Sequence, residues 1–209
     1  MRLRPFYWLG WFLTRCWGTV FFGTRVTGRE NIPKSGGFIL ASNHISYYDP
    51  PLVGSFQRRE LYFLAKKELF RNKLFGALIT ATNSLPVSRG TIDRKAIELA
   101  VGVLKQGFGL TFFPEGTRAP KGTFLPAKPG LGLVAREAGV PIVPAYIHGA
   151  NDLKRCFWRK DRMTITYGEP FSAEWVMSHP AEKEGYLAIS EAVMERIRQL
   201  KETRNVKAD

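Results

Sequence analysis

A histidine and an aspartate stand close together in residues 42–50, and as a pair they could perform general-base chemistry. An imidazole whose Nδ1–H donates to a carboxylate keeps Nε2 free to take a proton from an alcohol. On one continuous helix His44 and Asp49 would point about 140° apart and could not pair. The pairing therefore needs a turn between two elements. Without that turn, the aspartate is only a helix cap beside an unrelated histidine.

The flanking residues predict such a turn. Residues 38–41 form an apolar run, which indicates a buried strand that ends just before His44. Asp49 precedes Pro50 and Pro51, so we expect it to be the N-cap of a helix with proline in its first turn. His44 would then lie at the carboxyl end of a strand, where open α/β sheets place their sites.

A second polar segment, Phe-Pro-Glu-Gly-Thr-Arg at residues 113–118, directly follows another predicted strand. Gly116 permits a tight turn that directs the flanking side chains. Arg118 could bind a phosphate through two parallel hydrogen bonds, and Glu115 could accept from a hydroxyl or hold Arg118 in place. The alternative is an ordinary surface salt bridge within a turn.

Two further cations could assist in binding an anion. Arg89 follows a predicted strand, and Lys128 precedes Pro129 and Gly130 at the start of a predicted helix. The amino end of a helix favours anions. Taken singly, each of these cations would most often be a solvated surface charge.

Strand and helix patterns alternate along the 209 residues, which are enough for one domain with a substantial core. We therefore expect an α/β fold: a single layered domain over residues 24–209, with a mostly parallel mixed sheet flanked by helices. Residues 69–81 should form an amphipathic helix, either packed in the core or facing a membrane. The expected strands are 24–27, 38–42, 61–65, 85–87, 109–113, 142–147 and 163–167, and the other helices are 50 onward, 93–105, 130–138 and 181–202.

The formal net charge of +13 implies a polyanionic partner. The first 29 residues hold five arginines and no acid, and eight aromatic residues lie between Phe6 and Phe22. Tryptophan and tyrosine favour the headgroup zone of a bilayer, where arginine meets anionic lipids. We therefore expect residues 1–23 to form a separate amphipathic helical segment that lies in the membrane interface, with a break at Gly10 or Gly18.

Two alternatives for this segment remain. A membrane span needs roughly 20 apolar residues, and Arg15 would fall inside it. The other alternative is an aromatic helix packed on the soluble core. A cleaved signal peptide is not expected, because Arg15 interrupts the apolar region and no small-residue cleavage site follows. The two cysteines and three histidines show neither a disulfide framework nor the spacing of metal ligands, so no metal is expected.

Four segments occur in order: residues 43–50, residues 85–89 (Leu-Pro-Val-Ser-Arg), residues 113–118 and residues 140–145 (Val-Pro-Ile-Val-Pro-Ala). Together they resemble the glycerolipid acyltransferase family, specifically its bacterial 1-acyl-glycerol-3-phosphate acyltransferases. The resemblance covers about residues 25–170. The chain departs from the family at Asn83, where a small glycine is usual.

The resemblance implies that His44 and Asp49 are the catalytic pair. It places the acceptor's glycerol phosphate against a set of residues from the other segments, namely Arg89, Glu115, Gly116, Thr117, Arg118 and Lys128. The implied reaction moves a fatty acyl group from acyl-CoA or acyl-carrier protein to the sn-2 hydroxyl of lysophosphatidic acid, without a cofactor. The product is phosphatidic acid, and the protein would sit on the cytoplasmic face of the cell membrane.

Two other functions are compatible with the same residues. A relative could acylate glycerol-3-phosphate or a different lysophospholipid. A non-catalytic protein could use the same charge to bind an anionic membrane or nucleic acid. We expect the lysophosphatidic acid acyltransferase, with an anionic membrane surface as its partner and no nucleic acid.

Overall fold

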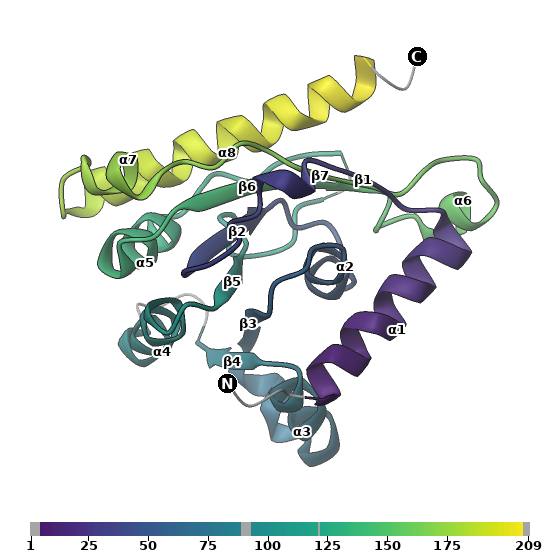
Figure 1. The fold of residues 1–209 in the computed structure, drawn as a ribbon, viewed down its shortest axis with the longest axis horizontal. Helices are drawn as coiled ribbons and strands as arrows, with labels where there is room; N and C mark the ends of the chain where they lie inside the picture. The colour runs from purple at the N-terminus through teal and green to yellow at the C-terminus, as the bar shows by residue number, and fades with distance from the viewer. Residues whose placement is uncertain (1–4, 89–92, 121, 207–209) are drawn as a thin grey trace.

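The computed structural model describes residues 5–88, 93–120 and 122–206. A seven-stranded sheet runs through the molecule in the order β1-β7-β6-β2-β5-β3-β4 (Figure 1). Every pairing is parallel except that of β6 with β7. The expected mixed, mostly parallel sheet is confirmed. The strands are β1 (Arg25–Thr27), β2 (Phe38–Ser42), β3 (Leu61–Lys66), β4 (Ser84–Val87), β5 (Gly109–Phe112), β6 (Ile142–His148) and β7 (Thr164–Tyr167).

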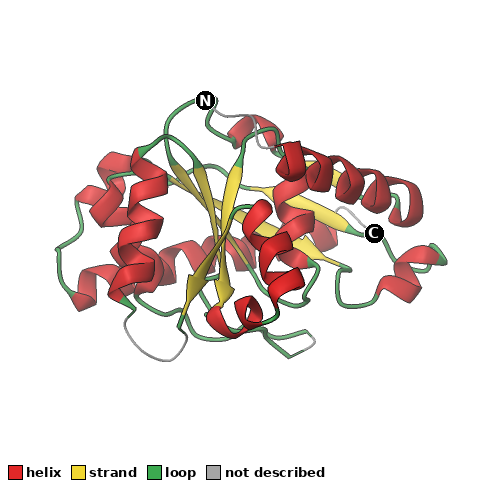
Figure 2. Ribbon diagram, turned by 90° about the horizontal axis from the view of Figure 1, so that it is seen from below, coloured by secondary structure: helices red, strands yellow, loops and turns green. Residues whose placement is uncertain are grey.

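Helices cover both faces of this sheet (Figure 2). Alternate side chains of β2 feed two separate cores, as a strand buried on both faces requires. Ile39 and Ala41 pack toward α4, α5 and α8, whereas Phe38 and Leu40 pack toward α2. The helices are α1 (Pro5–Phe22), α2 (Asp49–Ser55), α3 (Lys73–Ala81), α4 (Arg94–Lys105), α5 (Gly130–Ala138), α6 (Leu153–Phe157), α7 (Ala173–Met177) and α8 (Lys183–Val206), with 3-10 turns η1 (Arg29–Asn31) and η2 (Lys67–Arg71).

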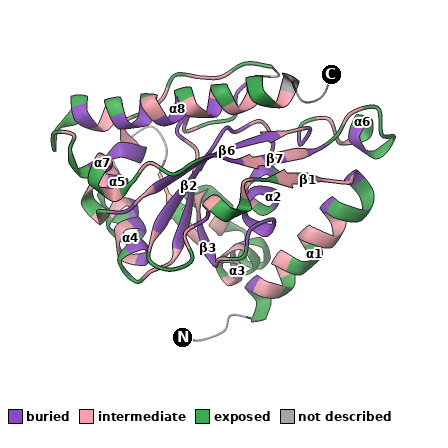
Figure 3. Cartoon of the chain, turned by 45° about the horizontal axis from the view of Figure 1, so that its top comes forward, coloured by how far each residue is buried: buried purple, intermediate pink, exposed green. Residues whose placement is uncertain are grey.

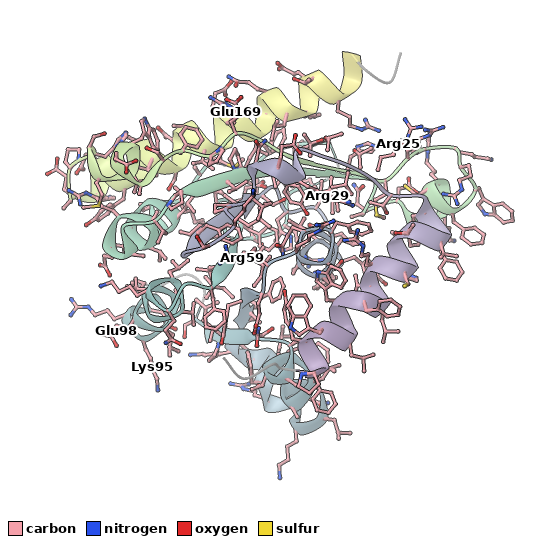
Figure 4. The ribbon with its side chains drawn as sticks, viewed as in Figure 1. Arg25, Arg29, Arg59, Lys95, Glu98 and Glu169 are labelled. Atoms are coloured by element: carbon pink, nitrogen blue, oxygen red, sulfur yellow. The ribbon has the colours of Figure 1, made fainter. Side chains whose placement is uncertain are left out.

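The ends of several helices follow the chemistry of their caps. Asp93 caps α4 by accepting from the Ala96 N–H. The outer face of α4 presents Lys95 and Glu98 to solvent (Figure 4).

At the amino edge of the sheet, the Arg59 guanidinium donates to the carbonyls of Pro33, Gly36 and Gly107. Arg59 thereby ties together the loops on the edge where the parallel strands begin.

Two local predictions need correction. Tyr48, not Asp49, is the N-cap of α2, and the aspartate is the first helical residue, with proline at the next positions as expected. The predicted helix 69–81 is two elements, because Asn72 ends η2 and caps α3 by accepting from the Phe75 N–H. Of α3 only Gly76 is buried, so a core helix is wrong for this segment.

The N-terminal segment forms one helix, α1, without the break predicted at Gly10 or Gly18. Gly18 instead lets α1 approach α2 closely, since a Cβ there would lie 2.9 Å from the Phe56 ring. Tyr7 and Phe22 are buried on this inner face. Figure 3 shows buried, intermediate and exposed stretches along α1. The helix is thus packed on the core along one side, as one of the alternatives held.

The opposite side of α1 exposes a row of large apolar side chains. No helix among residues 5–88, 93–120 and 122–206 is long and apolar enough to cross a membrane. The exposed residues of α1 are Phe6, Leu9, Phe12, Leu13, Val20 and Phe21.

Candidate active site

The parallel pairing of β2 with β5 and β6 brings the chemically interesting segments to one edge of the sheet. His44 lies two residues after the end of β2, and the segment 113–118 follows β5. Both segments therefore emerge at the carboxyl edge, where a parallel sheet concentrates its sites. Segments 71 residues apart in the chain meet here, as the bond from the His44 N–H to Glu115 shows.

His44 and Asp49 form the predicted pair. Nδ1 of His44 lies 2.8 Å from Oδ2 of Asp49, and both side chains are buried. The same oxygen accepts the backbone N–H of Ile45 at 2.6 Å and of Ser46 at 2.7 Å. The loop thus wraps around the carboxylate, which is how residues five apart come into contact.

The hydrogen-bond partners of the carboxylate fix the position of the imidazole proton. An oxygen that already accepts two backbone N–H groups acts as an acceptor toward His44, so Nδ1 must carry the proton. Nε2 of the neutral ring is then the free acceptor. The Phe113 ring stacks on the imidazole, with the ring centroids 4.1 Å apart and the planes at 20°. His44 is therefore held by a carboxylate at one edge and an aromatic ring on one face.

Glu115 is a buried clamp between two loops. Oε1 accepts the His44 backbone N–H at 3.0 Å, and Oε2 accepts the Leu125 N–H at 2.7 Å. Burial raises the pKa of the Glu115 carboxyl, against the opposing effect of these two backbone N–H groups. Since the carboxylate is turned inward to the backbone, it fixes the position of His44.

The turn after Glu115 brings a lysine to the same edge. Gly116 has a left-handed backbone with φ of 71°, and a Cβ there would lie 3.3 Å from Nζ of Lys128. The Lys128 N–H donates to the Pro114 carbonyl at 2.9 Å. Gly116 is therefore needed both for the turn and for the close passage of the Lys128 side chain.

Arg118 is exposed and lies against Tyr47. Its guanidinium carbon is 3.5 Å from the centroid of the Tyr47 ring, and Nη2 donates to the hydroxyl of that tyrosine at 2.8 Å. This contact joins the 113–118 turn to the 43–50 loop from the solvent side. Thr117 beside it is exposed, and Arg89 lies outside the described residues.

Comparison with known proteins gives the same picture of the chain. A family model described as Acyltransferase matches residues 23–148, which include both polar segments. The chain belongs to the acyltransferase family. It is 32% identical over 179 residues to the 1-acyl-sn-glycerol-3-phosphate acyltransferase of Bacillus subtilis, covering 85% of this chain and 88% of that protein.

Other members of the acyltransferase family are similar to this chain. The protein of the same name from Streptococcus pneumoniae is 31% identical over 144 residues, which are 68% of this chain and 53% of that protein. The crystal structure of the 1-acyl-sn-glycerophosphate (LPA) acyltransferase PlsC from Thermotoga maritima superposes with a TM-score of 0.72 at 29% identity. That match covers 95% of this chain and 79% of the Thermotoga chain.

In this acyltransferase the site includes positions to which the sequence assigned no role. The Asn43 amide exchanges two hydrogen bonds with the backbone of Ile147, at 3.0 and 2.8 Å, and so fastens the loop to β6. Tyr47 and Phe113 contact Arg118 and His44 as described. The only sequence signal for the Asn43 contact is an asparagine just after a buried strand. Nothing in the sequence pattern indicated the ring contacts of Tyr47 and Phe113.

An open hollow of about 400 Å³ lies beside this loop. One wall is made by residues 45–48 with Arg118, and the other by residues 150–154, which follow β6. The hollow is thus lined by the loop that carries the pair and by the exposed cation Arg118. Among the described residues, no group of three or more histidine, cysteine, aspartate or glutamate side chains could hold a metal ion.

Proposed function

We propose that this acyltransferase transfers a fatty acyl group from a thioester to the sn-2 hydroxyl of lysophosphatidic acid, making phosphatidic acid in phospholipid biosynthesis. The donor is acyl-CoA or acyl-carrier protein. The observation that carries the proposal is the His44–Asp49 pair at the carboxyl edge of the sheet, clamped through Glu115 to a turn that bears Arg118. The names of the Bacillus and Streptococcus relatives supply the acceptor.

In the proposed reaction His44 acts as a general base. Nε2 takes the proton of the sn-2 hydroxyl while its oxygen attacks the thioester carbonyl. The C–S bond then breaks, and the imidazolium returns the proton to the departing sulfur. Asp49 holds the tautomer through Nδ1 and stabilises the imidazolium with its negative charge. Base catalysis of this kind contributes roughly 10²–10⁴-fold, and positioning adds to it.

The acceptor's phosphate would bind the cations around the 113–118 turn. Arg118 is exposed beside the hollow. The Lys128 side chain passes close to Gly116, which belongs to the same turn as Arg118. A dianionic phosphate between these two cations would orient the glycerol backbone toward His44. We propose Gly116 and Thr117 as backbone and side-chain contacts, Arg89 as a third cation, and no metal or cofactor in these steps.

Glu115 has a different part in this proposal. Both of its oxygens are engaged by backbone N–H groups, one of them that of His44. We therefore assign it the positioning of His44 in place of the direct contact with the acceptor that the family resemblance implies. A carboxylate held this way transmits any shift of the 113–118 turn directly to the histidine.

We also propose that α1 rests in the membrane interface on the cytoplasmic face of the cell membrane, as a peripheral or monotopic attachment. Its inner face is packed on α2, and its outer face exposes large apolar side chains. Lysophosphatidic acid is a membrane lipid, whereas both donors are water-soluble, so the site has to work at that boundary. The basic residues that are not assigned to the acceptor's phosphate would attract anionic lipid headgroups.

Turnover by the purified protein with lysophosphatidic acid and oleoyl-CoA tests the proposal. His44→Ala should abolish turnover and leave binding to anionic vesicles intact. His179→Ala is the matched control, because that imidazole contacts the Trp175 carbonyl in α7, remote from the carboxyl edge. Turnover retained by His44→Ala would overturn the assignment of the base.

A panel of acceptors tests the substrate. Lysophosphatidic acid should be acylated in preference to glycerol-3-phosphate and lysophosphatidylcholine, each offered with the same donor. Preference for either rival would replace the acceptor in the proposal and leave the chemistry of the pair unchanged. Running the panel with acyl-CoA and with acyl-carrier protein also decides the donor.

A further inference from the structure

A short segment after β6 exposes two large aromatic side chains among cations. It comprises α6 and the turn that follows, residues 153–162, and we call it the α6 loop. Trp158 is 71% exposed and Phe157 is 46% exposed. The α6 loop carries one acid, Asp161, which is bound by His148 and Arg204. Its cations are Lys154, Arg155, Arg159, Lys160 and Arg162.

The α6 loop is attached to the carboxyl end of α1. The Phe157 ring stacks on Phe21 of α1, with the centroids 6.4 Å apart and the planes at 19°. Nη2 of Arg159 donates to the Val20 carbonyl at 3.3 Å, where a cation also suits the helix dipole. Figure 1 shows α6 beside this end of α1. The exposed aromatic residues of the α6 loop therefore continue the exposed apolar face of α1.

The combination of aromatic and basic residues favours a lipid surface over other polyanions. Cations alone would satisfy an acidic protein or a nucleic acid. Trp158 is largely exposed and packs edge-to-face on Phe157, with the ring centroids 5.3 Å apart. Such a tryptophan gains most where its ring leaves water and its N–H stays at the headgroups. Surrounding lysine and arginine side chains reach anionic headgroups at the same depth.

We propose that the α6 loop is a second membrane-contact element, which binds an anionic lipid surface beside α1. A single helix lying in the interface leaves the domain free to roll about the helix axis. A second contact at one end of that helix removes this freedom. Because Leu153 and Lys154 also line the hollow beside the 43–50 loop, the α6 loop would hold the mouth of the hollow at the lipid surface. This last consequence rests on the proposed function; the lipid contact itself does not.

Quenching of tryptophan fluorescence tests the contact. Vesicles of phosphatidylcholine and phosphatidylglycerol with brominated acyl chains quench a tryptophan that enters the bilayer. The difference between the wild type and Trp158→Phe isolates Trp158 from the tryptophans of α1. We expect that difference to be strongly quenched. Trp175→Phe is the matched control, because Trp175 belongs to α7, at the other end of the molecule from α6 (Figure 1), and packs on Phe171. The fluorescence difference between the wild type and Trp175→Phe should be unquenched. An unquenched Trp158 difference would overturn the proposal.

A partition measurement gives a second, independent test. The double variant Phe157→Ala/Trp158→Ala should bind anionic vesicles about tenfold more weakly than the wild type. Leu99→Ala, an exposed apolar change on α4, should bind as the wild type does. Melting temperatures establish that both variants are folded. Partition of the double variant equal to that of the wild type would overturn the proposal.

Two further measurements separate this proposal from its rivals. These vesicles contain neither acceptor nor donor, so quenching of Trp158 in His44→Ala protein would uphold the lipid contact even if the proposed reaction failed. Acyl-carrier protein offered without vesicles probes the main alternative partner. If the double variant lost carrier-protein binding and kept its vesicle binding, the α6 loop would be a protein-docking surface and the proposal would be wrong.

Discussion

At the scale of single residues, the unusual feature is that three N–H donors converge on one oxygen of Asp49. Two of them belong to the backbone of Ile45 and Ser46, and the third is Nδ1 of His44. The two backbone donors would hold a carboxamide oxygen in the same place. In Asp49→Asn the correct imidazole tautomer should therefore survive, and only the negative charge should be lost.

This geometry makes Asp49→Asn a measure of charge alone. We expect kcat to fall about 100-fold with KM nearly unchanged, because the imidazolium loses its counter-charge. Asp49→Ala removes the hydrogen bonds as well, so its kcat should fall further and the loop should loosen. Steady-state kinetics of the two variants decide the matter. Equal losses in both would mean that the oriented hydrogen bond contributes nothing beyond the charge.

Glu115→Gln separates positioning from substrate binding. An amide cannot accept from both His44 and Leu125, so one backbone N–H is left unpaired at a cost of about 1–3 kcal/mol in unfolding free energy. If Glu115 positions the base, kcat should fall while KM for lysophosphatidic acid stays the same. A rise in KM with an unchanged kcat would return the residue to the acceptor site.

The same variant has a pH signature. Burial raises the pKa of Glu115, so the native state holds this proton more tightly than the unfolded chain does. The group therefore favours folding below the ordinary glutamate pKa of 4.5, and that contribution is lost as pH rises through the higher native pKa. Urea unfolding at a series of pH values above 4.5 should show this decline in the wild type and not in Glu115→Gln. Parallel profiles would contradict it.

Asn83 shows what a departure from a family pattern can mean. Its backbone is left-handed with φ of 64°, a conformation that glycine adopts freely and asparagine tolerates. Its side-chain amide donates to Glu60 at 2.8 Å, so Asn83 makes a buried hydrogen bond that glycine could not make. The sequence alone could mark this position as different, but the backbone angle that makes the exchange possible is visible only in the structure.

At the scale of elements, α1 is docked by specific polar contacts as well as by apolar ones. The Tyr7 hydroxyl accepts the Leu61 N–H at the start of β3, at 2.9 Å, and Trp11 Nε1 donates to the Gln57 carbonyl, also at 2.9 Å. Tyr7→Phe leaves a buried N–H unpaired and should lower the unfolding free energy by about 1–3 kcal/mol. Phe6→Ala on the outer face is the control and should change it little. Denaturant unfolding compares the two, and equal effects would mean that the hydroxyl is not anchoring α1.

Elements whose pattern depends only on local burial were predictable. The apolar run of β2 is buried on both faces, and its boundaries come out as expected. Elements decided by a distant contact were not. Gly18 indicated a helix break, yet it is where α1 meets the Phe56 ring. Asn72 looked like part of a continuous helix, yet its side chain ends one element and caps the next.

In the candidate site, too, the contacts between neighbouring residues were predictable and the contacts between distant segments were not. The His44–Asp49 contact could be predicted because one turn builds it from neighbouring residues. The clamp from Glu115 joins loops 71 residues apart, and no local pattern revealed that its carboxylate faces the backbone. Which loops meet depends on the order of the strands in the sheet, and that order is a property of the whole chain.

At the scale of the whole molecule, α3, α1 and α6 follow one another along one side (Figure 1). Each of the three elements has exposed large apolar residues. Leu74 of α3 is 87% exposed, more than any other large apolar residue that the structure describes. Removing residues 1–23 would be a poor test of this surface. Tyr7 and Phe22 belong to the buried core, so the truncation would expose α2 and unsettle the fold together with any membrane contact.

Changing only the outer face of α1 avoids that difficulty. Leu9, Phe12 and Leu13 are exposed, and glutamine keeps a good helix propensity at each position. The triple glutamine variant should lose roughly 1 kcal/mol of apolar transfer per side chain, so its partition onto anionic vesicles should fall about 100-fold at an unchanged melting temperature. The attraction that remains should include a strong electrostatic part from the basic residues. It should weaken strongly between low salt and about 1 M, where the screening length shrinks to about 3 Å. Sedimentation with vesicles at both salt concentrations measures each part, and wild-type partition by the triple variant at both would exclude α1 as the contact.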